Sequence, residues 1–100
     1  MNKSFQIGGT IIGAGQPPYI IAEMSGNHNN DLSRALRIID AAKDAGVHAV
    51  KIQTYTADTI TIDHDGDEFL IKEGLWAGRN LYELYEEAHT PWGWHKAMFD

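Results

Sequence analysis

The sequence contains no cysteine, which excludes disulfide bonds and thiolate zinc sites. Basic residues are also scarce, because eight lysines and arginines stand against fourteen aspartates and glutamates, for a net charge of -6. A chain without a basic run does not favour phosphate backbones, so we expect no nucleic-acid partner. No stretch approaches the ~20 apolar residues of a membrane span, and the N-terminus lacks the apolar core of a signal peptide. We therefore expect a cytoplasmic protein with no membrane partner.

The composition is otherwise that of a globular protein. Hydrophobic residues make up 43% and aromatic residues 10% of the 100 positions. This apolar content separates the chain from disordered tails, which bury too little apolar surface to fold. The length is enough for about one small domain.

Residues 1–15 predict a short β-hairpin. The segment FQIGGTIIG places two apolar runs around Gly8 and Gly9, and a Gly-Gly pair tolerates the positive φ angles of a two-residue turn. Pro17 and Pro18 then interrupt regular structure because they lack amide donors. Residues 16–100 are predicted to form a separate unit.

This second unit begins with a strand, a helix and a strand. YIIAEM, residues 19–24, is short and apolar on both faces, as expected of a buried parallel strand. Asp31 is the predicted helix N-cap, apolar residues recur from Leu32 with one-face helical spacing, and Gly46 closes the helix. VHAVKIQT supplies the second strand. A strand-helix-strand crossover makes its two strands parallel, so the predicted class is α/β.

Residues 55–79 form a long connection with an acidic middle, which is typical of functional or mobile segments. Two helices are expected after it, the first with Asn80 and Glu83 as a capping box and the second with Thr90 and Pro91 at its start. The acidic stretch DHDGDE does not match a calcium loop, because its glycine stands at the wrong position. The five histidines show no metal-ligand spacing, so no metal ligand is assigned within the chain.

Two charged residues lie in the predicted strands. Side chains alternate along a strand, so Glu23 and Lys51 each occupy one defined face. If the strands are neighbours ~4.8 Å apart, the two charges lie side by side at the C-terminal edge, where α/β proteins bind ligands. The pair is then either a structural ion pair or part of a ligand site, and spacing alone weighs both equally. Asn27 and His28, in the SGNHNN loop, are either turn formers or active-site groups.

The segments AEMSGNHN, DAAKDAG and VKIQTY, with LWAGR followed by LYELY, together resemble the N-terminal part of the sialic acid synthase family, and most of all its pseudaminic branch. The resemblance covers nearly the whole chain. It implies that residues 16–100 are the first βα units of a (β/α)8 TIM barrel preceded by the hairpin. The barrel is incomplete, because a whole one takes ~250 residues.

The resemblance also implies a transferase reaction. Phosphoenolpyruvate condenses with an open-chain acetamido sugar, giving a nonulosonic acid and phosphate. In the pseudaminic branch this sugar is a 2,4-diacetamido-2,4,6-trideoxy-hexose. A divalent metal ion (Mn, Mg or Co) polarises the sugar aldehyde, and its ligands are expected beyond this chain. Full-length members are expected to be homodimers.

The expected roles of individual residues follow from matching positions. By this resemblance Lys51 is a catalytic residue that contacts phosphoenolpyruvate, and Glu23 is a catalytic residue that faces the sugar and the attacking water. Gln53, Asn27 and His28 match neighbouring positions and are expected to bind substrate.

The LWAGR segment adds Trp76 and Arg79 as expected substrate-binding residues. The sialic branch has a more polar sugar-contacting segment at this place. The apolar replacement suits a 6-deoxy sugar with two acetamido groups, because fewer hydroxyls and more apolar surface need covering.

Two rival hypotheses stay open. The first is a synthase of N-acetylneuraminate or legionaminate, which applies the same chemistry to another sugar. The second is a stand-alone binding module without catalysis. Two parallel strands with exposed edges are also a poor basis for a stable monomer, so we expect the chain alone to be inactive.

Overall fold

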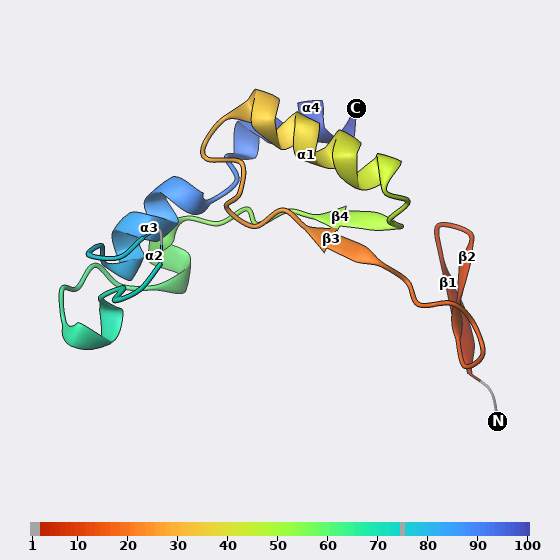
Figure 1. The fold of residues 1–100 in the computed structure, drawn as a ribbon, viewed down its shortest axis with the longest axis horizontal. Coiled ribbons are helices and arrows are strands. Elements are labelled where there is room, and N and C mark those ends of the chain that lie inside the picture. The colour runs from red at the N-terminus through yellow and green to blue at the C-terminus, as the bar shows by residue number, and fades with distance from the viewer. Residues whose placement is uncertain (1–2, 75) are drawn as a thin grey trace.

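A computed structural model describes residues 3–74 and 76–100. Met1 and Asn2 of the predicted hairpin segment, and Leu75 of the LWAGR motif, lie outside the described residues. The described chain contains an antiparallel strand pair, a parallel strand pair and a series of helices (Figure 1). The fold is therefore mixed α/β.

The predicted hairpin is present. Strands β1 (Ser4–Ile7) and β2 (Thr10–Gly13) pair antiparallel around a two-residue turn. The turn glycines have φ angles of +53° at Gly8 and +85° at Gly9, which side-chain-bearing residues adopt only with strain. The hairpin stands at one end of the molecule, away from the helices (Figure 1).

Helix α1 (Leu32–Asp44) begins and ends where the sequence predicts. The Asp31 side chain accepts a hydrogen bond from the Arg34 amide at 3.3 Å, which caps the first turn. At the other end Gly46 has a φ angle of +86°. The Gly46 amide donates to the Lys43 carbonyl at 3.0 Å, and the Val47 amide donates to the Ala42 carbonyl at 3.3 Å. This pair of bonds is the Schellman motif that ends helices at glycine.

Strands β3 (Ile21–Glu23) and β4 (Ala49–Lys51) flank α1 and pair in parallel, as predicted. Their burial differs from the prediction, because Ile20 and Ile21 are 51% and 54% exposed. The cause is the size of the sheet. With two strands and α1 lying along one side (Figure 1), the other side has no covering layer within the described residues.

The connection between β4 and the last helices is more ordered than predicted. It contains helix α2 (Ala57–Ile60) and the 3-10 helix η1 (Asp67–Phe69). At the start of α2 the Thr59 hydroxyl accepts from the Thr56 amide at 3.3 Å and donates to the Thr56 carbonyl at 2.7 Å. We missed α2 because four residues are too few to show helical periodicity.

Helix α3 (Leu81–Ala88) has Asn80 as its N-cap, as expected. The 3-10 helix η2 (Trp92–Trp94) and helix α4 (His95–Phe99) follow it. The assignment of Thr90 as a helix cap was wrong. Thr90 is fully buried, its amide donates to the Gln53 carbonyl at 2.8 Å, and Pro91 is the residue that precedes η2. No helix in the described ranges is long and apolar enough to cross a membrane.

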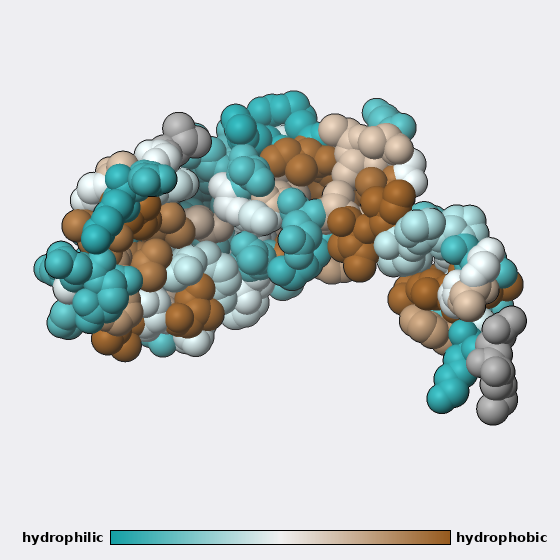
Figure 2. Space-filling model, turned by 60° about the horizontal axis from the view of Figure 1, so that its bottom comes forward, coloured by the Kyte–Doolittle hydropathy of each residue, from teal (hydrophilic) through white to brown (hydrophobic). Residues whose placement is uncertain are grey.

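The hydrophobic core is small for a chain of this size. Within residues 3–74 and 76–100, four apolar residues are buried, namely Met24, Ala35, Ala57 and Ala88. The accessible surface is 7237 Å², whereas a folded monomer of this mass exposes about 5,700 Å². The radius of gyration is 17.2 Å, against about 13 Å for a compact domain of 100 residues. Figure 2 shows the result, with hydrophobic residues gathered in patches on the surface.

We expect the isolated chain to lack a cooperative unfolding transition, because so small a core cannot offset the conformational entropy of 100 residues. A thermal melt followed by near-UV and far-UV circular dichroism, together with binding of a hydrophobic dye, tests this expectation. The predicted result is a gradual loss of signal with strong dye binding. A single sharp transition without dye binding would contradict it.

Candidate functional site

The parallel register places Glu23 directly opposite Lys51. The Lys51 Nζ lies 3.2 Å from the Glu23 Oε1, and the two side chains are 50% and 60% exposed. Both residues end their strands, so the pair marks the C-terminal edge of the sheet. An exposed ion pair stabilises a fold by only ~0–1 kcal/mol, so stability alone is a weak reason for two charges at this edge. Because both side chains are at least half exposed, a ligand can reach both charged groups.

The loop after β3 has an unusual backbone. Three of its residues other than glycine have positive φ angles, namely Ser25 at +52°, Asn29 at +51° and Asn30 at +56°. The left-handed region costs such residues free energy, so contacts around the loop must hold it in place. One contact is made by Asn27, whose amide and side-chain nitrogen donate to the Met24 carbonyl at 3.1 and 2.9 Å.

His28 makes further contacts that hold this loop. Its ring is fully buried and meets the Trp94 ring edge-on, with the centroids 5.0 Å apart. Its Nδ1 accepts a hydrogen bond from the Asn30 amide at 2.9 Å, so the neutral ring carries its proton on Nε2. Burial lowers the pKa of His28; the Ala88 backbone opposes this shift, and the nearby His89 adds to it.

A cleft of about 450 Å³ opens beside this loop. The volume is in the range of small-molecule sites. Its walls come from the loop after β3, the start of α1, the chain that follows β4, the LWAGR segment and α3. The lining residues are Ser25, Gly26, Asn27, Asn29, Arg34, Gln53, Tyr55, Trp76, Leu84, Tyr85 and Ala88.

Three of the predicted substrate-binding residues, Asn27, Gln53 and Trp76, line this cleft together. The other three, Lys51, His28 and Arg79, are not among the lining residues, and neither is Glu23. His28 is buried and its ring accepts a hydrogen bond from within the loop, which is a structural role. Its contact with substrate stays a prediction.

Sequence reasoning missed several cleft residues. Tyr55 follows Lys51 and Gln53 at the two-residue spacing of one strand face, a signal that the sequence contains. The Tyr55 ring meets the Tyr85 ring edge-on, with the two centroids 5.7 Å apart. Burial raises the pKa of Tyr55, and the nearby Tyr85 raises it further. Arg34 gave no such signal, because it lies off the apolar stripe of α1. Its Nε donates to the Asn27 carbonyl at 2.7 Å.

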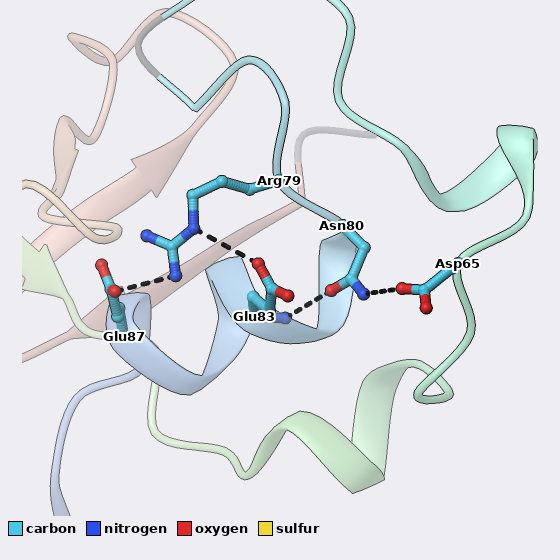
Figure 3. Close-up of polar contacts among 5 residues, drawn as sticks. All are labelled: Asp65, Arg79, Asn80, Glu83 and Glu87. Carbon is cyan, nitrogen blue, oxygen red and sulfur yellow. Dashed lines mark hydrogen bonds and ion pairs between the residues drawn. The ribbon is translucent and has the colours of Figure 1, made fainter.

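Arg79 is engaged by acidic residues of α3 (Figure 3). Its Nη2 lies 2.8 Å from the Glu87 Oε1 and its Nε lies 3.6 Å from the Glu83 Oε2. The hydrogen bond and charge of Arg79 hold the pKa of Glu87 below its usual value. The backbone amide of Glu83 donates to the Asn80 side chain at 2.8 Å, as the predicted helix cap requires. The Glu83 carboxylate, in contrast, faces Arg79.

The described residues bring together no group of three or more histidine, aspartate or glutamate side chains that could hold a metal ion. A metal ion would need such a group of ligands. These residues alone therefore do not fit the divalent metal that the sequence resemblance implies.

Comparison with known proteins places this strand pair, loop and cleft in a family. Residues 38–100 match the model of the NeuB family, and similarity to curated members extends over most of the chain. The chain belongs to the NeuB family, the sialic acid synthases.

Several individual relatives are similar to this chain over part of their length. The chain is 55% identical over 82 residues to a pseudaminic acid synthase of Campylobacter jejuni, covering 82% of this chain and 24% of the relative. A Helicobacter pylori pseudaminic acid synthase is 47% identical over 85% of the chain and 25% of the relative. An N,N'-diacetyllegionaminic acid synthase of Legionella pneumophila is 48% identical over 48% of the chain and 14% of the relative. The chain thus spans about a quarter of the length of the pseudaminic acid synthases that it matches.

The burial of His28 predicts a dependence on pH. Its pKa lies below 6.5 in the folded protein, so the unfolded chain binds the proton more readily. The contribution of the neutral ring to stability is therefore fully present above pH 6.5, and it is lost as the pH falls from 6.5 through the lower pKa of the folded state. In the full-length protein that carries this segment, one histidine Cε1 resonance followed by NMR should titrate below 6.5 and disappear in His28→Gln. A midpoint at or above 6.5 for that resonance would contradict the burial of the ring.

Proposed function

We propose that this chain is the N-terminal part of a pseudaminic acid synthase. The supporting observation is its 55% identity to the Campylobacter jejuni enzyme over 82 of its 100 residues. In this proposal phosphoenolpyruvate and a 2,4-diacetamido-2,4,6-trideoxy-hexose are the substrates, and a nonulosonic acid and phosphate are the products. Residues 16–100 supply the first βα units of a TIM barrel, and residues 1–15 form a hairpin ahead of it.

Lys51 and Glu23 have complementary roles in this reaction. Phosphoenolpyruvate carries a carboxylate and a phosphate, and the ammonium of Lys51 attracts either group at the open edge of the sheet. Glu23, whose carboxylate is 3.2 Å from that ammonium, orients the water that attacks C2 and accepts its proton. Binding of the anionic substrate to Lys51 would release Glu23 from the ion pair for this work.

The reaction proceeds through two bond-forming events. The C3 carbon of phosphoenolpyruvate attacks the sugar aldehyde to form the new C–C bond, and the aldehyde oxygen gains a proton. Water adds at C2, and cleavage of the C–O bond releases phosphate. Gln53 and Asn27 line the cleft, and in this proposal their side chains hold the sugar during these steps.

The metal dependence of the family is part of this proposal. A bound divalent ion polarises a carbonyl oxygen as a Lewis acid. Since the described residues gather no ligand group for it, the ligands would come from the remainder of the enzyme. A homodimer in the cytoplasm is likewise proposed for the full-length protein, on family resemblance alone.

The proposed activity predicts a substrate preference. The full-length protein that carries this segment should release phosphate from phosphoenolpyruvate with the diacetamido sugar at least about 10-fold faster, in kcat/KM, than with N-acetylmannosamine. Phosphate release and product mass are the measurements. A preference for N-acetylmannosamine would reject the pseudaminic branch in favour of N-acetylneuraminate synthesis. An absence of turnover with every sugar, in a protein shown to be folded, would reject the enzyme hypothesis.

Lys51→Ala should raise the KM for phosphoenolpyruvate and lower kcat. Removing one partner of a close charge contact costs about 2 kcal/mol or more, so kcat/KM should fall at least about 30-fold. Lys43→Ala is the matched control, because Lys43 is an exposed lysine in the last turn of α1. Steady-state kinetics in phosphoenolpyruvate distinguish the outcomes. Unchanged constants for Lys51→Ala would make the pair with Glu23 a structural one.

A further inference from the structure

The segment between Ile71 and Arg79 is a loop closed at its base. The Ile71 amide donates to the Arg79 carbonyl at 2.9 Å, and the Gly78 amide donates to the Ile71 carbonyl at 2.9 Å. Trp76 lies within this closed loop and lines the cleft. These bonds hold the two ends of the loop together, while the large side chain of Trp76 still needs a contact to hold its orientation.

Arg79 supplies that contact. Its guanidinium carbon lies 5.5 Å from the centroid of the Trp76 ring, which is the distance of a cation-π interaction. The same guanidinium is fixed to α3 by Glu87 at 2.8 Å and Glu83 at 3.6 Å (Figure 3). Because its guanidinium contacts Glu83, Glu87 and Trp76 at once, the Arg79 side chain has little freedom to move toward a substrate.

We propose that Trp76 determines which acetamido sugar the cleft accepts, an inference that rests on the proposed synthase function. Arg79 is then a positioning residue, which acts only by holding Trp76. This assignment changes the expected role of Arg79, which the sequence resemblance had made a substrate-binding residue. It also explains why Arg79 is absent from the cleft lining while Trp76 is present.

The chemistry of the cleft wall supports a sugar with few hydroxyls. Trp76, Tyr55 and Tyr85 present aromatic rings to the same cleft. Ring faces pack well against methyl and CH groups, as in acetamido methyls and a 6-deoxy carbon. A hydroxyl placed against a ring face loses its water partners without gaining a hydrogen bond, which disfavours sugars that keep those hydroxyls.

A double-mutant cycle in the full-length protein tests the assignment. Trp76→Ala should raise the KM for the diacetamido sugar about 10-fold or more and leave the KM for phosphoenolpyruvate unchanged. Arg79→Gln should shift the same constant in the same direction by a smaller factor. Because Arg79 acts through Trp76, Arg79→Gln should have no further effect in the Trp76→Ala protein.

The matched control is Lys96→Ala. It removes another cation that is paired within one helical turn, since the Lys96 Nζ lies 2.7 Å from the Asp100 Oδ2, and it should change neither KM. Circular dichroism of each variant checks that it folds. If Arg79→Gln does not fold, Glu87→Gln loosens the same contact with Arg79 in place and takes its position in the cycle.

Two results would overturn the inference. Independent, multiplying effects of Arg79→Gln and Trp76→Ala would mean that Arg79 contacts the sugar itself. An unchanged sugar KM in Trp76→Ala would remove Trp76 from specificity. Both are read in variants of an active enzyme, whereas a failure of the proposed function appears as inactivity, or a preference for N-acetylmannosamine, in the unmodified protein.

Discussion

The parallel register of β3 against β4 is the constraint on which the rest of the site depends. It pairs Ile21 with Ala49 and Glu23 with Lys51, so the two charges meet at the last position of each strand. Side chains alternate along a strand, and a slip of one residue would turn one charge to the opposite face. The same register sets where both strands end, and hence where the loop after β3 and the chain beyond β4 leave the sheet to enclose the cleft.

The register is held by elements on one side of the sheet. Helix α1 connects the two strands and is fixed at both ends, by Asp31 at its start and by the Schellman motif at Gly46. Little lies on the other side within the described residues, so apolar side chains such as Ile21 stay in water. Parallel sheets are normally covered on both faces. The incomplete cover therefore agrees with a chain that spans about a quarter of its relatives, and it explains why the local structure is well defined while the core is small.

The polar part of the site is organised by contacts between distant segments. His28 reaches Trp94, and the Thr90 amide reaches the Gln53 carbonyl. These contacts bring the final helices against the loop after β3, where three residues other than glycine hold positive φ angles. Strain of this kind persists only where the surroundings determine it. A fixed loop and a clamped Trp76 give the cleft a defined shape before any ligand is bound.

The sequence by itself determined the local structure: the Gly8-Gly9 turn, the limits of α1 and the strand face on which Glu23 and Lys51 each lie, whereas their opposition depended on the pairing of the two strands. Each depends on short-range rules, namely the φ preference of glycine, helix capping and the alternation of side chains along a strand. Only the tertiary structure decided that His28 is buried, that Arg79 binds Glu83 and Glu87, and that Tyr55, Trp76 and Tyr85 share one cleft. These arrangements join residues from separate elements, and a linear pattern carries no signal for which side chains will meet when those elements pack.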